Sequence, residues 1–321
     1  MGPGFESLRE YKSEKHVSRF FCYFLIKSSF FSYLIQKFLL NFVFLLLTYK
    51  IFPMEKTKVL FVHQEIAPYL DENPISLVGR NLPEGIQMKG KEIRIFMPRF
   101  GNINERRNQL HEVIRLSGMN LIINDTDHPL IIKVASIQKA RMQIYFIDND
   151  DFFTKRKSTI ADKNGTFFED NDDRTIFFSR GVIETIRKLN WPPDIIHCHG
   201  WMSALIPIYI KKVFKDNPLF SESKIVYSIY DDDFTEMFRD GFDKKMKLQG
   251  IAPKDVKFLK DTDYVNLMKT ALDFSDGIIF GSEKINPELE EYAKSLKKPI
   301  LEYQSPETYV DAYNDFYDNL K

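Results

Sequence analysis

The stretch PDIIHCHGWMSALIPIYIK, Pro193 to Lys211, decides the fold class of this chain. Its first half contains a short apolar run that favours a buried β-strand, and its second half has the apolar spacing of a helix at Ala204 to Phe214. The turn between them consists of His199, Gly200 and Trp201. A buried strand, a tight turn and a helix make up the repeating unit of a parallel α/β sheet.

The same unit repeats along the chain on both sides of this stretch. The remaining expected strands are Lys58 to His63, Glu92 to Pro98, Val113 to Leu116, Leu130 to Ile137, Met142 to Ile147, Lys224 to Tyr230, Gly277 to Gly281 and a last one from Pro299. The remaining expected helices are Leu77 to Lys89, Asn171 to Leu189, Tyr264 to Phe274, Asn286 to Leu296 and Pro306 to Leu320. Asp240 to Asp261 is expected to be a long loop. This alternation predicts one Rossmann-like, doubly wound and mostly parallel sheet over residues 54–321.

Residues 1–53 are expected to be a separate apolar extension. The run from Phe20 to Phe52 follows several basic residues and resembles a signal anchor. Gln36 and two lysines interrupt it, however, so its longest apolar run is shorter than the roughly 20 residues that a spanning helix needs. Two interpretations stay open: a misassigned start, with Met54 as the true first residue, which we favour, and a membrane anchor or interfacial helix.

The charge and cysteine content excludes several classes of function. Acidic and basic side chains balance at 45 each, which argues against nucleic acid or an anionic membrane as a partner. Cys22 and Cys198 are too few for a disulfide framework and lack the spacing of a zinc site. We therefore expect a cytoplasmic protein without a metal or other cofactor, and a membrane location only if residues 20–52 are expressed.

Five stretches, in order, resemble the bacterial glycogen/starch synthases, whose members transfer glucose from ADP-glucose to the end of an α-1,4-glucan. They are VHQEIAPY at Val62 to Tyr69 with the MPRFG turn that follows, YFIDNDDFFTKR at Tyr145 to Arg156, EDNDDRTIFFSRGVIE at Glu169 to Glu184, the opening stretch, and SDGIIFGSEKINPEL at Ser275 to Leu289. Each motif alone is weak, but five in register are specific. The resemblance implies the N-terminal half of a two-domain GT-B glycosyltransferase.

One loop departs from the family pattern. Family members have a glycine-rich KTGG loop that approaches the sugar nucleotide, and the aligned residues here are Asp71, Glu72, Asn73 and Pro74. Replacing a lysine by an acid, and glycines by residues with side chains, should repel a diphosphate, so we expect this degenerate phosphate loop to disfavour ADP-glucose. We interpret it as a solvated turn in which Asn73 and Pro74 begin the following helix.

The strand ends depart from the pattern as well. His199 matches the second histidine of the HxHDW motif, which contacts the transferred glucose in the family, and it is the one catalytic candidate. Trp201 keeps the motif's tryptophan and is a substrate-binding candidate, whereas Gly200 replaces the aspartate and Tyr230 replaces the histidine of TIHN. For His199, residual sugar contact and a strand-end residue without a ligand stay open, and we favour the second. We expect His197 to be a hydrogen-bonded structural residue.

Further polar residues keep the identities of the family's DN-type motifs: Asp148, Asn149, Asn171 and Arg174. They either position a glucan hydroxyl or, as we favour, cap and brace helices. Asp231 to Asp233 form a carboxylate run without the pattern of a Ca²⁺ loop. We expect a solvated loop there, not a metal site.

The resemblance covers only the half of a synthase that lacks most nucleotide contacts. Transfer from a nucleotide sugar needs charge stabilisation of the departing diphosphate and exclusion of water by two closing domains. We therefore expect a synthase-like protein that is inactive alone, with a separately encoded synthase half as a candidate partner. The alternative is a pseudoenzyme that serves as a non-catalytic scaffold and binds α-glucan or a synthase.

Overall fold

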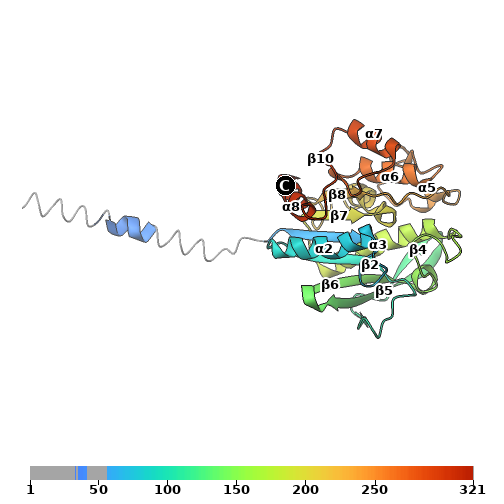
Figure 1. Ribbon diagram of the computed structural model, residues 1–321, viewed down its shortest axis with the longest axis horizontal. Helices are drawn as coiled ribbons and strands as arrows, with labels where there is room; N and C mark the ends of the chain where they lie inside the picture. Colours follow the sequence, from blue (N-terminus) through green and yellow to red (C-terminus); the bar gives the residue numbers. More distant parts are fainter. Residues whose placement is uncertain (1–32, 34, 42–55, 321) are drawn as a thin grey trace, which may run out of the picture. The chain divides into compact units, whose positions relative to one another are not determined.

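The computed structural model describes residues 33, 35–41 and 56–320 (Figure 1). The chain divides into two units, residues 1–55 and residues 56–321. Most of the apolar extension, and the proposed start at Met54, lie outside the described residues, so these interpretations stay predictions. In the described ranges, no helix is both long and apolar enough to cross a membrane.

A mostly parallel sheet forms the centre of residues 56–320 (Figure 1). Its strand order is β10-β9-β8-β7-β1-β2-β6-β5-β3, and β4 pairs with β5 outside this path. Neighbours are parallel from β10 to β6, whereas the pairs that involve β5 are antiparallel. The strands are β1 (Lys58–His63), β2 (Glu92–Pro98), β3 (His111–Glu112), β4 (Met119–Ile123), β5 (Thr126–Ile137), β6 (Met142–Asp148), β7 (Ile195–His199), β8 (Lys224–Ile229), β9 (Gly277–Phe280) and β10 (Ile300–Leu301). The predicted fold class is confirmed.

Helices pack against the sheet in two groups. α2 packs against β2 and α8, whereas α3 and α6 both contact α4, and α6 also contacts α7. The helices are α2 (Pro74–Met88), α3 (Asn171–Leu189), α4 (Ile206–Ile208), α5 (Phe242–Lys245), α6 (Tyr264–Asp273), α7 (Pro287–Ser295) and α8 (Tyr309–Leu320), with the shorter turns η1 (Gln138–Ala140), η2 (Asp150–Thr154), η3 (Trp201–Ser203), η4 (Tyr209–Val213) and η5 (Pro253–Val256).

Three local expectations were wrong. The strand expected at Val113 to Leu116 is β3 instead, two residues earlier, and β4 was not foreseen. The helix expected at Ala204 to Phe214 consists instead of η3, the short α4, in whose first turn Pro207 is tolerated, and the π-helical turn η4. The loop expected at Asp240 to Asp261 contains α5 and η5, where buried Phe242 and Val256 hold helical turns against the core.

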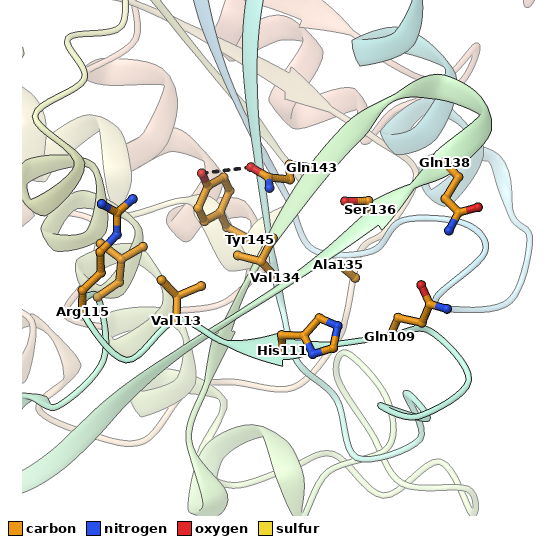
Figure 2. A pocket seen from close by; sticks show the side chains of 11 residues that line it. Gln109, His111, Val113, Arg115, Val134, Ala135, Ser136, Gln138, Gln143 and Tyr145 are labelled. Carbon is orange, nitrogen blue, oxygen red and sulfur yellow. Dashed lines mark hydrogen bonds between the residues drawn. The ribbon is translucent and has the colours of Figure 1, made fainter.

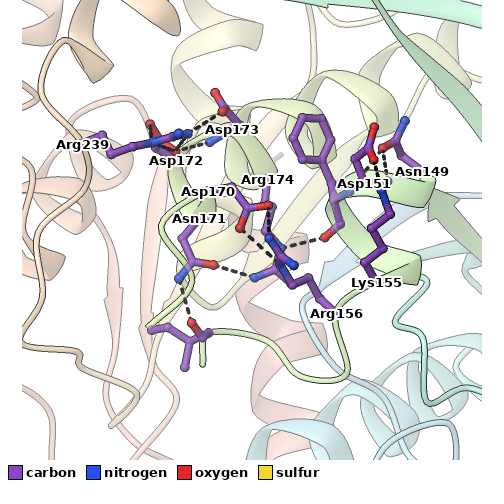
Figure 3. A network of polar contacts seen from close by, with 12 residues as sticks. Asn149, Asp151, Lys155, Arg156, Asp170, Asn171, Asp172, Asp173, Arg174 and Arg239 are labelled. Carbon is purple, nitrogen blue, oxygen red and sulfur yellow. Dashed lines mark hydrogen bonds and ion pairs between the residues drawn. The ribbon is translucent and has the colours of Figure 1, made fainter. Parts of the chain in front are cut away.

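An ion-pair network ties the segment that contains α5 to the start of α3 (Figure 3). Asp172, in the first turn of α3, is fully buried and accepts hydrogen bonds from Arg239 and from Lys245, whose Nζ lies 2.7 Å from its carboxylate. Asp173 also pairs with Lys245, at 2.9 Å. Carboxylates at a helix N-terminus are further stabilised by the helix dipole. The α5 segment is thereby fixed against α3.

The order of the strands reverses between β1 and β7. After β1 the chain builds β2 and β6 on one side, and β7 then returns to the other side of β1. In doubly wound sheets, ligands bind beyond the carboxyl ends of the strands at such a switch point. The register pairs His63, the last residue of β1, with His199, the last residue of β7.

Candidate functional site

Three histidine rings lie together at the carboxyl ends of β1 and β7. His197 and His199 lie on the same face of β7 because they are two residues apart. The ring centroid of His199 is 3.8 Å from that of His63 and 3.8 Å from that of His197, and all three side chains are fully buried. The described residues include no group of His, Cys, Asp or Glu side chains placed to hold a metal ion.

Two tyrosine hydroxyls occupy histidine nitrogens. Nδ1 of His197 lies 2.6 Å from the Tyr317 hydroxyl, and its Nε2 lies 2.8 Å from Oγ of Ser228. The expectation of a hydrogen-bonded structural role for His197 is therefore confirmed. Nδ1 of His199 lies 2.7 Å from the Tyr230 hydroxyl. Nε2 of His199 and both ring nitrogens of His63 are buried without a hydrogen-bond partner in the described structure.

Burial keeps these histidines neutral. It lowers the pKa of His63 to about 3 and holds the pKa values of His197 and His199 well below the ordinary 6.5, with the neighbouring imidazoles as a secondary cause. Burial also raises the pKa values of Tyr230 and Tyr317, so both hydroxyls stay protonated. A neutral imidazole offers a hydrogen-bonding nitrogen but no positive charge to balance a departing diphosphate.

Gln64 fills the space beside Gly200, where the family motif has an aspartate. Gly200 has φ 74°, and a Cβ at this position would lie 2.2 Å from Oε1 of Gln64. An aspartate therefore fits here only if the Gln64 side chain moves. Trp201, the next residue, is buried against the rings of Phe234 and Phe238, at centroid distances of 5.6 and 6.0 Å.

Sequence reasoning missed His63 and Gln64 at this site. Both lie in the first matched motif, but neither was singled out. The available signal was their position: they end the strand that a doubly wound order places next to the strand of His199. Reading the two strand ends as neighbours would have identified them.

Asp148 is the last residue of β6, Asn149 follows it, and both side chains are engaged within the domain. The Asp148 carboxylate pairs with Nζ of Lys133 at 2.8 Å and accepts a hydrogen bond from the Thr154 hydroxyl at 3.1 Å. The Asn149 side chain accepts hydrogen bonds from two backbone N–H groups of η2 and donates to the carbonyl of Pro129. These contacts brace the turn after β6, and a glucan contact for either residue stays a prediction.

Arg174 and Asn171 form a buried brace at the start of α3 (Figure 3). The guanidinium of Arg174 donates to the carbonyls of Phe152, Ser158 and Thr159 and to Oδ1 of Asn171. Burial lowers the pKa of Arg174 to about 9. Both residues hold two loops to the helix, and a substrate role for them stays a prediction.

The degenerate phosphate loop starts α2. Asn73 is the N-cap residue, its side chain accepts a hydrogen bond from the backbone N–H of Ser76 at 2.8 Å, and Pro74 is the first helical residue. Asp71 and Glu72 are exposed. The expected helix start at Asn73 and Pro74 is confirmed, while the repulsion of a diphosphate stays a prediction.

The carboxylates of Asp231 to Asp233 diverge, and the expectation of a solvated loop was wrong for the middle one. Asp232 turns toward the strand ends, where it accepts hydrogen bonds from Gln64 at 3.2 Å and from the Tyr264 hydroxyl at 2.6 Å. Burial raises its pKa to about 6. Asp233 instead accepts a hydrogen bond from Asn286, and Asp231 is exposed.

Two hollows on the described domain are larger than a third one, of about 340 Å³, that lies beside Lys211 and Lys298. The first, which we call the acidic hollow, has a volume of about 430 Å³ and lies beside the strand ends; its carboxylates are Glu65, Asp232, Asp233 and Glu236. The second has a volume of about 510 Å³ and is lined by residues of β3, β5 and β6 and their flanking loops (Figure 2). It contains His111 and Arg115, and none of the described residues that line it is acidic.

The comparisons with known proteins agree with this arrangement. The profile described as "Starch synthase catalytic domain" matches residues 58–300. The chain belongs to this family. It is 32% identical over 256 residues to a glycogen synthase of Pelodictyon phaeoclathratiforme, covering 77% of this chain and 51% of the relative. It is 33% identical over 222 residues to a glycogen synthase of Chlorobium limicola, covering 68% of this chain and 44% of the relative.

A solved starch synthase structure has a similar fold. The structure described as the catalytic domain of starch synthase IV from Arabidopsis thaliana bound to ADP and acarbose matches with a TM-score of 0.62 at 16% identity, covering 78% of this chain and 52% of that one. This chain therefore spans about half the length of the starch and glycogen synthases that it matches. It is synthase-like in sequence and carries one half of the GT-B fold.

Proposed function

We propose that this starch synthase-family chain does not transfer glucose by itself and acts as a non-catalytic module that binds α-glucan or a synthase. The observation that carries the proposal is the contact between the Tyr230 hydroxyl and Nδ1 of His199 inside a fully buried cluster. The histidine that matches the family's glucose-contacting position thus has one nitrogen occupied by a side chain and no exposed surface. A sugar at this place would have to displace packed aromatic rings.

The chemistry of the neighbouring groups supports the same proposal. The histidines are held neutral by burial, and the loop that should approach a diphosphate carries exposed Asp71 and Glu72. Stabilising a departing diphosphate requires positive or hydrogen-bond-donating groups that are already in place.

The second candidate is a synthase half that works with a separately encoded partner. It is favoured by the unpartnered nitrogens of His63 and His199, since buried polar atoms without hydrogen bonds are costly and often mark a place where a ligand or a partner group binds. They lie where ligands of doubly wound folds bind.

One set of measurements separates these candidates. The full chain is purified, ADP-glucose binding is measured by calorimetry, glucose transfer to glycogen is assayed, and glycogen binding is measured by co-sedimentation. We expect no turnover and no ADP-glucose binding at micromolar concentration, with retention on glycogen or on a synthase. Turnover by the chain alone would overturn the proposal, and turnover only after adding a separately encoded half would establish the second candidate.

We also propose a cytoplasmic location and no nucleic-acid partner. The balanced charge supports the second point, and the free, buried Cys198 fits a reducing compartment. Cell fractionation tests the location: recovery of the native protein with membranes would refute it.

A further inference from the structure

The acidic hollow carries negative charge that the domain does not neutralise. Its four carboxylates make no ion pair within 4.0 Å with a lysine or arginine of the described residues, and no basic residue is found among those that line it. Elsewhere in the domain, buried carboxylates such as Asp148 and Asp172 each have a lysine partner. Four uncompensated acids around one concavity produce a local field that attracts cations and repels a diphosphate.

Aromatic rings form another part of the wall of the same hollow. Phe167, Trp201 and Phe234 all line it, and the ring of Phe234 lies 5.5 Å from that of Phe167 and 5.6 Å from that of Trp201. Aromatic faces attract organic cations and also pack against the C–H groups of a ligand. A hydrated metal ion gains little from such a wall, and the described residues include no metal-holding group.

Gln64 adds a buried acceptor at the edge of the hollow. Its side chain is 2% exposed, and its Nε2 donates to the carboxylates of Glu65 and Asp232 at 3.4 and 3.2 Å. Because carboxylates only accept, this pairing determines the orientation of the amide and leaves Oε1 as the acceptor. Oε1 has no partner in the described structure. This oxygen therefore lacks a hydrogen-bond donor, whereas each carboxylate of the hollow accepts a hydrogen bond from a neutral group and keeps its charge uncompensated.

We propose that the acidic hollow binds an organic ligand through a primary ammonium group, which the carboxylates hold while the aromatic wall packs against the rest of the ligand. A primary ammonium supplies three hydrogen-bond donors and one positive charge. This matches a hollow whose carboxylates have no lysine or arginine partner within the described ranges. The ligand is an amino sugar or an aliphatic polyamine, since both combine an ammonium with C–H groups. The inference does not depend on the proposed function. Glycogen binding and ammonium binding are measured separately, so failure of one proposal leaves the other standing.

The test uses the full chain and three probes. Glucosamine and spermidine each carry an ammonium, and N-acetylglucosamine keeps the sugar ring without the charge. Titrations at pH 7 followed by protein NMR or calorimetry should show at least one amine binding about tenfold or more tighter than N-acetylglucosamine, and binding that weakens as salt rises. Preference for glucosamine identifies an amino sugar, and preference for spermidine identifies a polyamine. Equal binding of N-acetylglucosamine and glucosamine with no binding of spermidine, or no binding of either amine, would overturn the proposal.

Charge-removing variants locate the site. Asp233→Asn and Glu236→Gln change exposed carboxylates of the hollow, so the fold should tolerate both. Each should weaken amine binding about threefold to tenfold, and Phe234→Leu should weaken it through loss of a ring face. Glu291→Gln, an exposed change on α7 outside the lining, is the matched control and should leave binding unchanged. Unaltered amine binding in all three hollow variants would place the ligand elsewhere and refute the assignment.

Discussion

The Tyr230 hydroxyl lies 2.7 Å from Nδ1 of His199, and this contact joins the residue that follows β8 to the end of β7. Because both groups are fully buried, removing the hydroxyl leaves a buried nitrogen without a partner. We expect Tyr230→Phe to lower the free energy of unfolding by about 1–3 kcal/mol in urea titrations. Tyr303→Phe, at a side chain that is 40% exposed, is the control. Equal stability of the wild type and Tyr230→Phe would show that the contact contributes nothing.

The histidine cluster should make the protein sensitive to acid. The folded pKa of His63, about 3, lies below its ordinary value of 6.5, so the unfolded chain takes up a proton that the folded chain refuses. The corresponding stability is present above pH 6.5 and is lost as the pH falls toward 3, at about 1.4 kcal/mol per pH unit for this residue alone. His197 and His199 shift in the same direction and should steepen the loss.

Replacement of His63 by leucine tests this pH dependence. His63→Leu removes two unpartnered ring nitrogens and one titrating group, so we expect a shallower decline of unfolding free energy between pH 7 and pH 5. Urea titrations at three pH values measure it, with exposed His111→Gln as the control. An unchanged slope would mean that burial of His63 does not shift its protonation.

Gly200 and Gln64 should be energetically coupled. Gly200→Ala forces a side chain into a backbone conformation that favours glycine and toward the Gln64 side chain. Gly165 also has positive φ, 82°, but has nothing within 4 Å of an added Cβ, so Gly165→Ala measures the backbone cost alone. We expect Gly200→Ala to destabilise more than Gly165→Ala, and Gln64→Ala to relieve part of the difference, with a coupling of about 0.5–3 kcal/mol. Strict additivity would contradict the clash.

Arg174 should be a stability residue. Arg174→Met keeps much of the side-chain volume but leaves the carbonyls of Phe152, Ser158 and Thr159 without these donors. We expect a loss of about 3 kcal/mol or more in the free energy of unfolding. Arg107→Met, at an exposed position, should change it by less than about 0.5 kcal/mol. A stable Arg174→Met protein with altered glucan binding would instead favour the substrate role.

The spacing of apolar residues along the chain predicted those helices and strands that are determined by residues close in sequence. The bounds expected for α3 agree with the structure because its apolar residues recur at helical spacing and Asn190 ends it in the left-handed conformation. The β3 region was placed two residues late because a two-residue edge strand with exposed side chains has no burial pattern to read.

The sequence by itself determined the strand–helix alternation, the family resemblance and the identities of the residues at the strand ends, because these depend on spacing along the chain. Only the tertiary structure decided that His63 stacks on His199, that Tyr230 and Tyr317 occupy histidine nitrogens, and that Asp232 turns inward to Gln64. The physical reason is that parallel pairing brings strand ends from distant parts of the chain into contact, and burial then sets their protonation. No pattern of residues close in sequence encodes which residue lies on the neighbouring strand, or how deeply a side chain at the strand end is buried.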